Sequence, residues 1–576
     1  MKYKIILLYV LLIYGCYSNC APLENIPIQI TQPDGTVLFC YTSGDEFYHW
    51  LHDENGNIIV QDSISGFYCY MIEGTDSLVI ASNNSLPVMR YSKYSYDINK
   101  LRHENIEFYD QIKNKPYLFA PSHTRSFTNI NNIVIFITFS DQDDYVAFDI
   151  NIISTMHNDS SENANSLKNY YWASSYNQLK VNSYIYPTGM TNYSYKDIYP
   201  RQYYCPFSSD NPLGYNTLYS RKLREDSLLI RAITYIQGQI PSDLNLDTDN
   251  DGKVDNICFI IKGGTTEWNT LLWPHQWSLW QNKYINGKKV YDYNIQLSDF
   301  IFSHGVGVLC HEFGHTLGLP DLYHGYADST GYTWKPVGRW DIMSSNGYYP
   351  QQTSGYMKCT YLHWINEIPE ITKSGRYKIS PISYSPQCYK ISIEGSNEFL
   401  YLEYRKRNLA YDSYIPESGL IIYRINPSKS GNFNATTGGG KDDKVYVYRP
   451  NGNFLSDGNL DNAPFSIALN KTKFNATTNP QEFLSDGGVG NVYISNVQES
   501  DSTISFNVKI CSSEDIIYVH DSNIPTYTNG NSIMSSGNVV IENDSTFFEA
   551  SDNIVLNGGF KVLEGSLFRA DVIPCE

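Results

Sequence analysis

Basic residues are few in this chain of 576 residues. Lys and Arg number 42 against 60 Asp and Glu, which gives a formal net charge of -18 at pH 7. Nucleic-acid binding requires a basic face, so this charge balance argues against a nucleic-acid partner. An acidic surface suits a soluble protein outside the cell, and carboxylate-rich surfaces bind calcium readily.

Long apolar runs are missing beyond the N-terminus. The first four residues carry two lysines, and residues 5–14 form an apolar run, which together are typical of a secretory signal. The run is too short to anchor the chain as a membrane-spanning helix, and no later segment is apolar enough for one. We therefore expect a signal peptide over residues 1–20 and an extracellular protein. The alternative is a lipid anchor at Cys16 in the outer membrane, because residues 13–16 loosely resemble a bacterial lipoprotein box.

The eleven cysteines lack the C-x-x-C spacing of a cysteine-based metal site. Export permits disulfides, but the sequence does not show which cysteines pair. Cys511 and Cys575 bracket the last segment and either staple it or stay apart. Cys310 is expected to be a small buried thiol.

Charged residues make up only 18% of the chain, whereas aromatic residues make up 15% and include 50 tyrosines. This composition is typical of an ordered, β-leaning protein. A chain of this length exceeds one hydrophobic core, so we expect three or four domains.

The most informative stretch contains H-E-x-x-H, the zinc-peptidase signature, at residues 311–315. Residues four apart lie on one face of a helix, so His311 and His315 present two imidazoles to one point. A catalytic zinc takes three protein ligands and leaves a position for water. Glu312 is the expected general base beside that water.

The third ligand distinguishes two classes of zinc peptidase. One class takes a glutamate from a second helix, and this reading would require Glu367 or Glu370, because no Glu lies between Glu312 and Glu367. In the other class, the metzincins, the helix breaks at a glycine and the third ligand follows three residues later. Gly318 fits that break, which makes Asp321 the predicted ligand; His324 is the rival.

Two features after Asp321 support the metzincin interpretation. Pro320 prevents the helix from continuing. Met343 fits the methionine that packs beneath the metal of metzincins in a tight turn. Tyr348 or Tyr349 then follows as a candidate stabiliser of the transition state.

The segments HEFGHTLGLPDLY and GRWDIMSSNG resemble the immune-inhibitor-A-like family of secreted zinc metallopeptidases. One departure is His324, where the family often has Asp. The resemblance implies an α+β, metzincin-like catalytic domain over residues 126–368. Within it the apolar run at residues 133–139 predicts a buried strand, and residues 163–179 and 212–238 predict helices.

Residues 21–125 contain short alternating runs separated by Gly and Asn-Gly, which predict a β-rich domain. They also resemble the pro-region of the same family, which implies a zymogen. Candidates for blocking the metal in it are Asp45, His49, Cys40 and Cys69. The alternative is that these four residues only build the β-rich domain.

The segment Asp247–Asp255 predicts a structural calcium loop. Its expected ligands are Asp247, Asp249, Asp251, the carbonyl of Lys253, and Asp255. The twelfth position is Cys258 instead of Glu, so the loop is not a complete EF-hand. An Asp-rich turn without metal is the alternative reading.

Two further histidines are weaker candidates for a role at the metal site. His275 lies in a Trp-x-His-x-Trp-like segment, where a packing role is the alternative. His304 is expected at the start of the active-site helix, where a capping or surface role is the alternative.

The chain after residue 368 is rich in predicted strands. Residues 369–510 predict a β-sandwich. Residues 511–576 hold short, regularly spaced strands that predict a small β-solenoid-like tail, and they resemble tail domains on secreted proteins of Bacteroidetes-type bacteria.

The leading hypothesis is a secreted zinc endopeptidase, made as a zymogen, that acts on extracellular proteins or peptides with Zn²⁺ and a structural Ca²⁺. The alternative is a surface adhesion or binding protein whose peptidase-like domain is inert. The intact Glu312 and the complete ligand set argue against that alternative.

Overall fold

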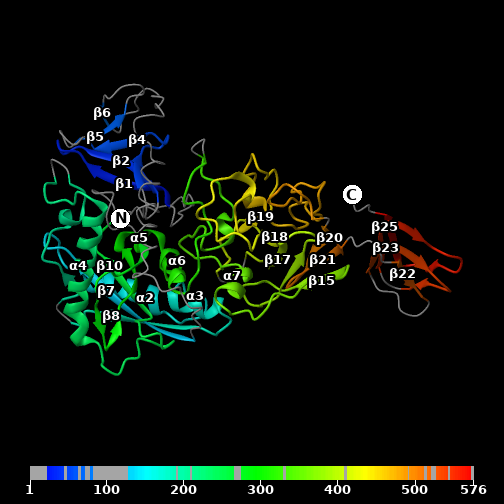
Figure 1. Cartoon of the computed structure of the whole chain (residues 1–576), viewed down its shortest axis with the longest axis horizontal. Helices are drawn as coiled ribbons and strands as arrows, with labels where there is room; N and C mark the ends of the chain where they lie inside the picture. The colour runs from blue at the N-terminus through cyan, green and yellow to red at the C-terminus, as the bar shows by residue number, and fades with distance from the viewer. Residues whose placement is uncertain are drawn as a thin grey trace, which may run out of the picture.

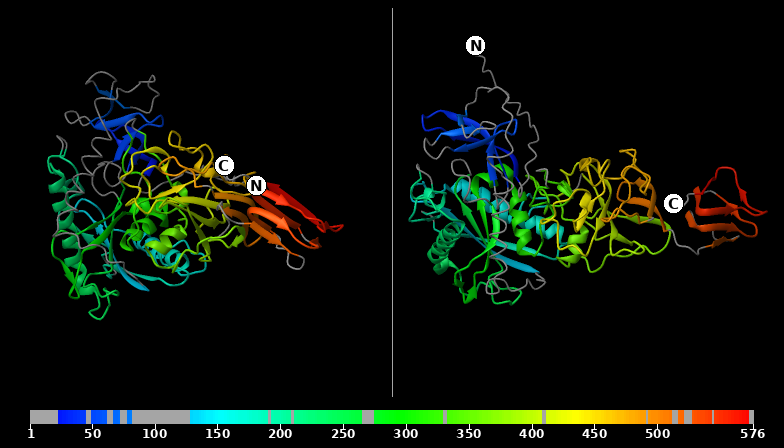
Figure 2. Two further views of the ribbon diagram at one scale, coloured as in Figure 1. Left: turned by 45° about the vertical axis from the view of Figure 1, so that its right-hand side comes forward. Right: turned by 45° about the horizontal axis from the view of Figure 1, so that its top comes forward.

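The computed structural model describes most of the chain. The described residues are 23–44, 49–61, 67–71, 78–81, 128–189, 192–207, 211–264, 274–328, 332–407, 411–490, 492–510, 516–520, 527–542 and 545–572. The predicted signal peptide over residues 1–20 lies outside these residues, as do Cys16, Asp45, Cys511 and Cys575. Figures 1 and 2 show an elongated molecule with the C-terminal sheet at one end and the N-terminal sheet on one side of the central helices and sheet. None of the described helices is long and apolar enough to cross a membrane.

The first unit is a six-stranded antiparallel sheet whose strands follow one another in chain order. The strands are β1 (Leu23–Thr31), β2 (Val37–Gly44), β3 (His49–His52), β4 (Ile58–Gln61), β5 (Tyr68–Met71) and β6 (Leu78–Ile80). Cys40 and Cys69 are buried in this sheet, and burial raises the pKa of the Cys40 thiol to about 12. A thiol of that kind is a poor metal ligand, because the thiolate is the ligand form.

The central sheet has the order β11-β14-β10-β7-β8. The short strand β9 also pairs with β7, at Ile137 and Thr138, after the residues of β7 that pair with β8. Its strands are β7 (Asn129–Thr138), β8 (Lys180–Tyr186), β9 (Tyr195–Lys196), β10 (Asn256–Ile261), β11 (His275–Ser278) and β14 (Asp292–Leu297), with a small hairpin of β12 (Tyr284–Ile285) and β13 (Lys288–Lys289) outside the sheet. All pairs are parallel except that of β11 with β14. β7 is buried on both faces, as its unbroken apolar run predicts.

Helices cover both faces of the central sheet (Figure 1). They are α2 (Ala147–Asn158), α3 (Leu167–Ser174), α4 (Leu218–Ile236), α5 (Ser298–His304), α6 (Val306–Thr316) and α7 (Gly355–Thr360), with 3₁₀ turns η1 (Arg201–Tyr204), η2 (Gln237–Gln239) and η3 (Gly338–Trp340). Residues of α2, α3 and α6 form one apolar cluster, and residues of α4 form a second.

Several helix boundaries differ from the sequence predictions. The helix predicted to end at residue 179 ends at Ser174, because Tyr176 and Asn177 adopt positive φ angles of 55° and 66°. The helix predicted from residue 212 begins after the Thr217 cap. His304 does not open the active-site helix but ends α5, since Gly305 with φ of 67° separates the two helices.

The β-rich region after α7 contains two larger sheets. One joins β15 (Gly375–Ile379), β21 (Ile504–Ile510) and β20 (Val492–Glu499); the other joins β16 (Cys388–Ser392), β17 (Phe399–Arg405), β18 (Gly419–Ile425) and β19 (Val445–Val447), and two 3₁₀ turns, η4 (Gly438–Gly440) and η5 (Leu460–Asn462), accompany them. Side chains of both sheets share one buried cluster, which is compatible with the predicted β-sandwich.

The C-terminal sheet has the order β22-β23-β25-β27, and each pair is parallel. Its strands are β22 (Ile516–Val519), β23 (Tyr527–Ser535), β25 (Ser545–Val555) and β27 (Leu567–Val572), beside a parallel pair of β24 (Val540–Ile541) and β26 (Lys561–Val562). Stacked parallel strands are compatible with the predicted solenoid-like tail. The chain thus combines several β-sheets with helices, as expected of a multidomain α+β protein.

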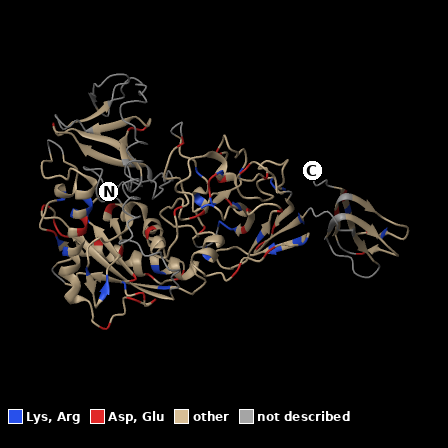
Figure 3. Cartoon of the chain, in the orientation of Figure 1, with Lys and Arg blue, Asp and Glu red and all other residues tan. Residues whose placement is uncertain are grey.

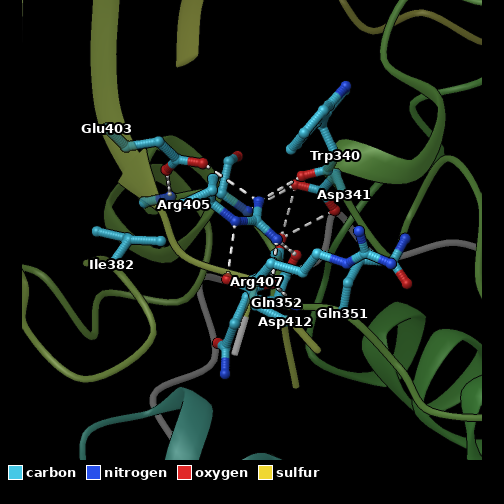
Figure 4. A network of polar contacts seen from close by, with 12 residues as sticks. Trp340, Asp341, Gln351, Gln352, Ile382, Glu403, Arg405, Arg407 and Asp412 are labelled. Atoms are coloured by element: carbon cyan, nitrogen blue, oxygen red, sulfur yellow. Dashed lines mark hydrogen bonds and ion pairs between the residues drawn. The ribbon is translucent and has the colours of Figure 1, made fainter. Parts of the chain in front are cut away.

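A buried polar network joins the central region to the β-rich region (Figure 4). Arg405, the last residue of β17, donates to the carbonyl of Trp340 at 2.5 Å and to that of Gln352 at 3.2 Å. It also makes hydrogen bonds of 2.5 and 3.0 Å to both oxygens of Asp412 and lies 3.3 Å from Glu403. Figure 3 shows Lys and Arg interspersed with Asp and Glu along the chain. The ion pairs that Arg405 makes with Glu403 and Asp412 are fully buried.

The position of Arg405 makes it a strong determinant of stability. We expect Arg405→Met to lower the free energy of unfolding by about 3–5 kcal/mol, because it leaves the Asp412 and Glu403 carboxylates buried without their cation. Denaturant unfolding of the full chain measures this loss. The matched control is Arg407→Met, since the Arg407 side chain is exposed; equal losses for both variants would contradict the prediction.

Candidate metal centre

The helix α6 carries two of the three predicted metal ligands. Its last turn ends at Thr316, and the amide of Gly318 donates to the carbonyl of His315 at 2.9 Å. Gly318 has a φ of 92°, a conformation that favours glycine and that turns the chain away from the helix axis. The break directs the following residues, Leu319 to Asp321, back toward the side chains of His311 and His315.

His311, His315 and Asp321 come together at one point. Asp321 Oδ1 lies 3.4 Å from His311 Nε2 and 3.3 Å from His315 Nε2. All three donor atoms lie within 4.8 Å of one another. Donors around a tetrahedral zinc at about 2.0–2.1 Å are separated by about 3.3–3.4 Å, so the two measured distances fit the edges of such a site.

Two of the three donor atoms have no hydrogen bond among the described residues. These are His311 Nε2 and Asp321 Oδ1, and both are buried. A buried polar atom without a partner costs about 1–3 kcal/mol, and a cation between them would remove that cost. The three residues therefore fit a metal ion.

Backbone contacts orient both imidazoles. His311 Nδ1 lies 2.9 Å from the carbonyl of Ile342, and His315 Nδ1 lies 2.8 Å from the carbonyl of Leu319. A carbonyl only accepts, so Nδ1 carries the proton of each neutral ring, and Nε2 is the nitrogen left to bind a metal. Such hydrogen bonds fix the tautomer and the direction of a metal-ligating histidine.

Charge is concentrated around Glu312, which is 3% exposed. Burial raises the pKa of Glu312, the Asp321 charge adds to the rise, and His311 and His315 oppose it. Burial lowers the pKa of His315, but the Asp321 charge outweighs this effect and raises the value to about 9. A bound cation would compete with that proton, because a metal takes neutral imidazole.

Met343 packs directly against the helix between the two histidines. A Cβ atom added at Gly314 would lie 2.9 Å from Met343 Sδ, so only glycine leaves room for the thioether. The Met343 amide donates to Asp341 Oδ1 at 3.0 Å, and its carbonyl accepts from the Leu322 amide at 2.9 Å. The second contact ties the Met343 turn to the residue that follows Asp321.

The rival ligands lie elsewhere. His324 is fully buried, and its Nε2 lies 2.7 Å from Asp443 Oδ1. Glu370 lies 3.3 Å from Lys390 on β16. Neither belongs to the group formed by His311, His315 and Asp321.

The other site candidates take separate positions. Tyr348 and Tyr349 are 41% and 42% exposed, and Tyr348 covers Gly305 at the start of α6; a role at the transition state stays a prediction. His275 is buried with its Nε2 3.5 Å from Glu225. Burial lowers the pKa of His304 to about 4, and its ring stacks on Phe300, as in a packing residue.

A polar ladder that we did not predict lies beneath α6. Thr316 donates to Asn256 Oδ1 at 2.9 Å, and Asn294 donates to the same atom at 3.1 Å. Asn256 in turn donates to Asn132 at 2.7 Å, which donates to Ser183 at 3.0 Å. The ladder crosses four strands and fixes the turn that follows His315. Its only sequence signal is an asparagine inside each of three apolar strands.

The predicted calcium loop gathers part of its ligand set. Carboxylates of Asp247, Asp249 and Asp251 lie within 4.8 Å of one another, and Asp247 Oδ1 is buried without a hydrogen-bond partner. Asp247 also accepts from Lys288 at 2.6 Å. Asp255 lies outside the group and instead accepts from the amide and hydroxyl of Thr248 at 2.9 and 2.8 Å.

Comparisons with known proteins find similar sequences for part of this chain. Residues 249–371 match the family model of the immune inhibitor A peptidase M6 catalytic domain. Pre-pro-metalloprotease PrtV of Vibrio cholerae serotype O1 (strain M66-2) is 28% identical over 145 residues, which are 22% of this chain and 15% of that protein. Immune inhibitor A of Bacillus thuringiensis subsp. alesti is 32% identical over 112 residues, 16% of this chain and 15% of that protein.

These alignments span only a small part of the relatives' length. Among solved structures, wild-type OgpA from Akkermansia muciniphila covers 56% of this chain and 91% of its own, at 12% identity and a TM-score of 0.22, values too low to support an inference. The region that holds the three candidate ligands, Glu312 and Met343 is thus similar to the peptidase M6 (immune inhibitor A) catalytic domain.

Proposed function

We propose that this protein is a zinc-dependent endopeptidase that hydrolyses peptide bonds of extracellular proteins. The observation that carries the proposal is the convergence of His311, His315 and Asp321. Asp321 Oδ1 lies at the spacing of a zinc site from both imidazoles, and in the described part of the chain His311 Nε2 and Asp321 Oδ1 make no hydrogen bond. Glu312 follows the first ligand directly, and the homology to peptidase M6 covers both the ligands and Glu312.

In this proposal Glu312 moves the protons of the reaction. A bound Zn²⁺ would act as a Lewis acid on the scissile carbonyl and lower the pKa of the attacking water. Glu312 takes a proton from that water and passes it to the leaving amine. Its burial favours both steps, since a carboxyl with a raised pKa holds a proton more readily than a solvated one.

We further propose that the protein is exported and made as a zymogen. The predicted signal over residues 1–20 and the similarity of residues 21–125 to a pro-region support this. The Vibrio relative is named a pre-pro-metalloprotease, and this name describes the same order of segments in that protein. Cys40 is a poor candidate for the blocking group, because burial raises its pKa to about 12.

The catalytic role of Glu312 is tested by Glu312→Gln. We expect the variant to keep its zinc, because Glu312 is not a ligand, and to lose at least about two orders of magnitude in cleavage of an unfolded protein substrate. Metal analysis and a cleavage assay measure the two quantities side by side. Glu367→Gln is the matched control and should cleave normally. Cleavage by Glu312→Gln at the wild-type rate would refute the mechanism.

We also propose that Asp247, Asp249 and Asp251 hold a structural Ca²⁺. Three carboxylates this close repel one another without a cation, and the unpartnered Asp247 Oδ1 supplies a buried donor atom. Asp255 is left out of the ligand set, because both of its oxygens accept from Thr248.

Calcium binding predicts a shift in thermal stability. A calcium-selective chelator should lower the melting temperature of the wild-type chain, because a ligand bound only to the folded state stabilises it. Asp249→Asn should weaken this response, whereas the exposed Asp243→Asn just outside the loop should keep it. The absence of any wild-type response would remove calcium from the proposal.

A further inference from the structure

The chain between Asp321 and Met343 rests on the β-rich region. The Gly325 amide donates to the carbonyl of Phe433 at 2.8 Å, and the carbonyl of Pro336 accepts from the Val447 amide at 3.0 Å. Trp340 Nε1 donates to the carbonyl of Leu460 at 2.9 Å. We call residues 322–340 the ligand loop; residues 329–331 within it lie outside the described chain. Both ends of this loop adjoin the metal centre.

Asn432 fixes the first residue of the ligand loop. Its Nδ2 donates to the carbonyl of Leu322 at 3.1 Å and to that of Val445 at 2.8 Å, and its Oδ1 accepts from the Val445 amide at 3.0 Å. Asn432 is fully buried. One amide side chain thus joins β19 to the residue beside Asp321.

His324 fixes the loop a second time. His324 Nε2 and Asp443 Oδ1 are 2.7 Å apart, and the two side chains are 0% and 1% exposed. Burial strengthens a hydrogen bond of this kind and makes the loss of one partner costly. The backbone of Asp443 is fixed in turn, because its amide donates to the carbonyl of Gly440 at 3.1 Å.

Asp321 depends on these contacts more than the two histidines do. His311 and His315 lie on a helix, and a backbone carbonyl orients each ring. Asp321 lies in a loop, and its metal-facing Oδ1 makes no hydrogen bond. The direction of its carboxylate therefore follows from the backbone positions of its neighbours, of which Leu322 contacts both Met343 and Asn432.

We propose that Asn432 and Asp443 of the β-rich region position Asp321 for metal binding, acting through Leu322 and His324. In this arrangement the β-rich region completes the metal centre although it contributes no ligand. The proposal rests on the proposed ligand set of His311, His315 and Asp321. It assigns a positioning role to His324.

The test compares zinc affinities of full-length variants by competition with a chromophoric chelator. Asp443→Asn removes the charge that faces His324, and it should weaken zinc binding about 10-fold or more, the usual effect of losing a group that orients a ligand. The neighbouring Asp442→Asn is the matched control. Asp442 pairs with Lys429 at the surface, at 2.9 Å, so its variant should bind zinc as the wild type does.

Two substitutions at His324 separate positioning from general destabilisation. His324→Gln keeps a nitrogen near the place of Nε2 and should retain most of the affinity, whereas the shorter His324→Asn cannot reach Asp443 and should lose it. Melting temperatures without metal report the purely structural effect. If Asp443→Asn does not fold, the Gln and Asn variants of His324 decide the question.

The outcomes separate this inference from the proposed function. A wild-type chain that binds no zinc would overturn the proposed ligand set itself. A wild-type chain that binds zinc, with Asp443→Asn and His324→Asn binding it equally well, would overturn only the positioning role. Lower melting temperatures with unchanged zinc affinity would also overturn it, because the contacts would then be structural alone.

Discussion

The structure depends on keeping buried donor atoms free of hydrogen bonds around one point. Within the described part of the chain, neither His311 Nε2 nor Asp321 Oδ1 makes a hydrogen bond, although a buried unpaired polar atom costs about 1–3 kcal/mol. The surrounding hydrogen bonds hold the ligand residues in place. Carbonyls of Ile342 and Leu319 hold the imidazoles, and the asparagine ladder fixes the end of α6 through Thr316. The rigidity of the metal centre therefore comes from polar contacts outside it.

The region after the catalytic segment takes part in this rigidity. Arg405 and Glu403 on β17 contact the segment around Trp340 and Gly355, and Glu403 accepts from the Gly355 amide at 2.8 Å. The sequence composition places a domain boundary at residue 368, but buried hydrogen bonds join the residues on its two sides. Charged groups of one region therefore pair with polar groups of the other, and leaving them buried without these partners would be costly.

The sequence predicted the local features well. The four-residue spacing of the histidines and the break at Gly318 fix where Asp321 falls, because both depend only on neighbouring residues. The buried strand β7 followed from its apolar run in the same way. The predicted roles of Tyr348 and Tyr349, by contrast, rested on order along the chain, which does not fix how far a side chain lies from the metal centre.

The long-range contacts could not be predicted. His324 and Asp443 are 119 positions apart, and Thr316 and Asn256 are 60 apart. No periodicity links such pairs, and each residue alone reads as an ordinary polar side chain. The early end of α3 depended on positive φ angles at Tyr176 and Asn177, for which a tyrosine gives no signal.

The most direct measurement is an anomalous difference map, recorded at the zinc absorption edge, from crystals of the zinc-loaded protein. The account predicts one strong peak at about 2.0–2.2 Å from His311 Nε2, His315 Nε2 and an oxygen of Asp321, with His324 still bonded to Asp443. A peak bound by His324, Glu367 or Glu370 in place of Asp321, or no peak at the two histidines, would contradict the account.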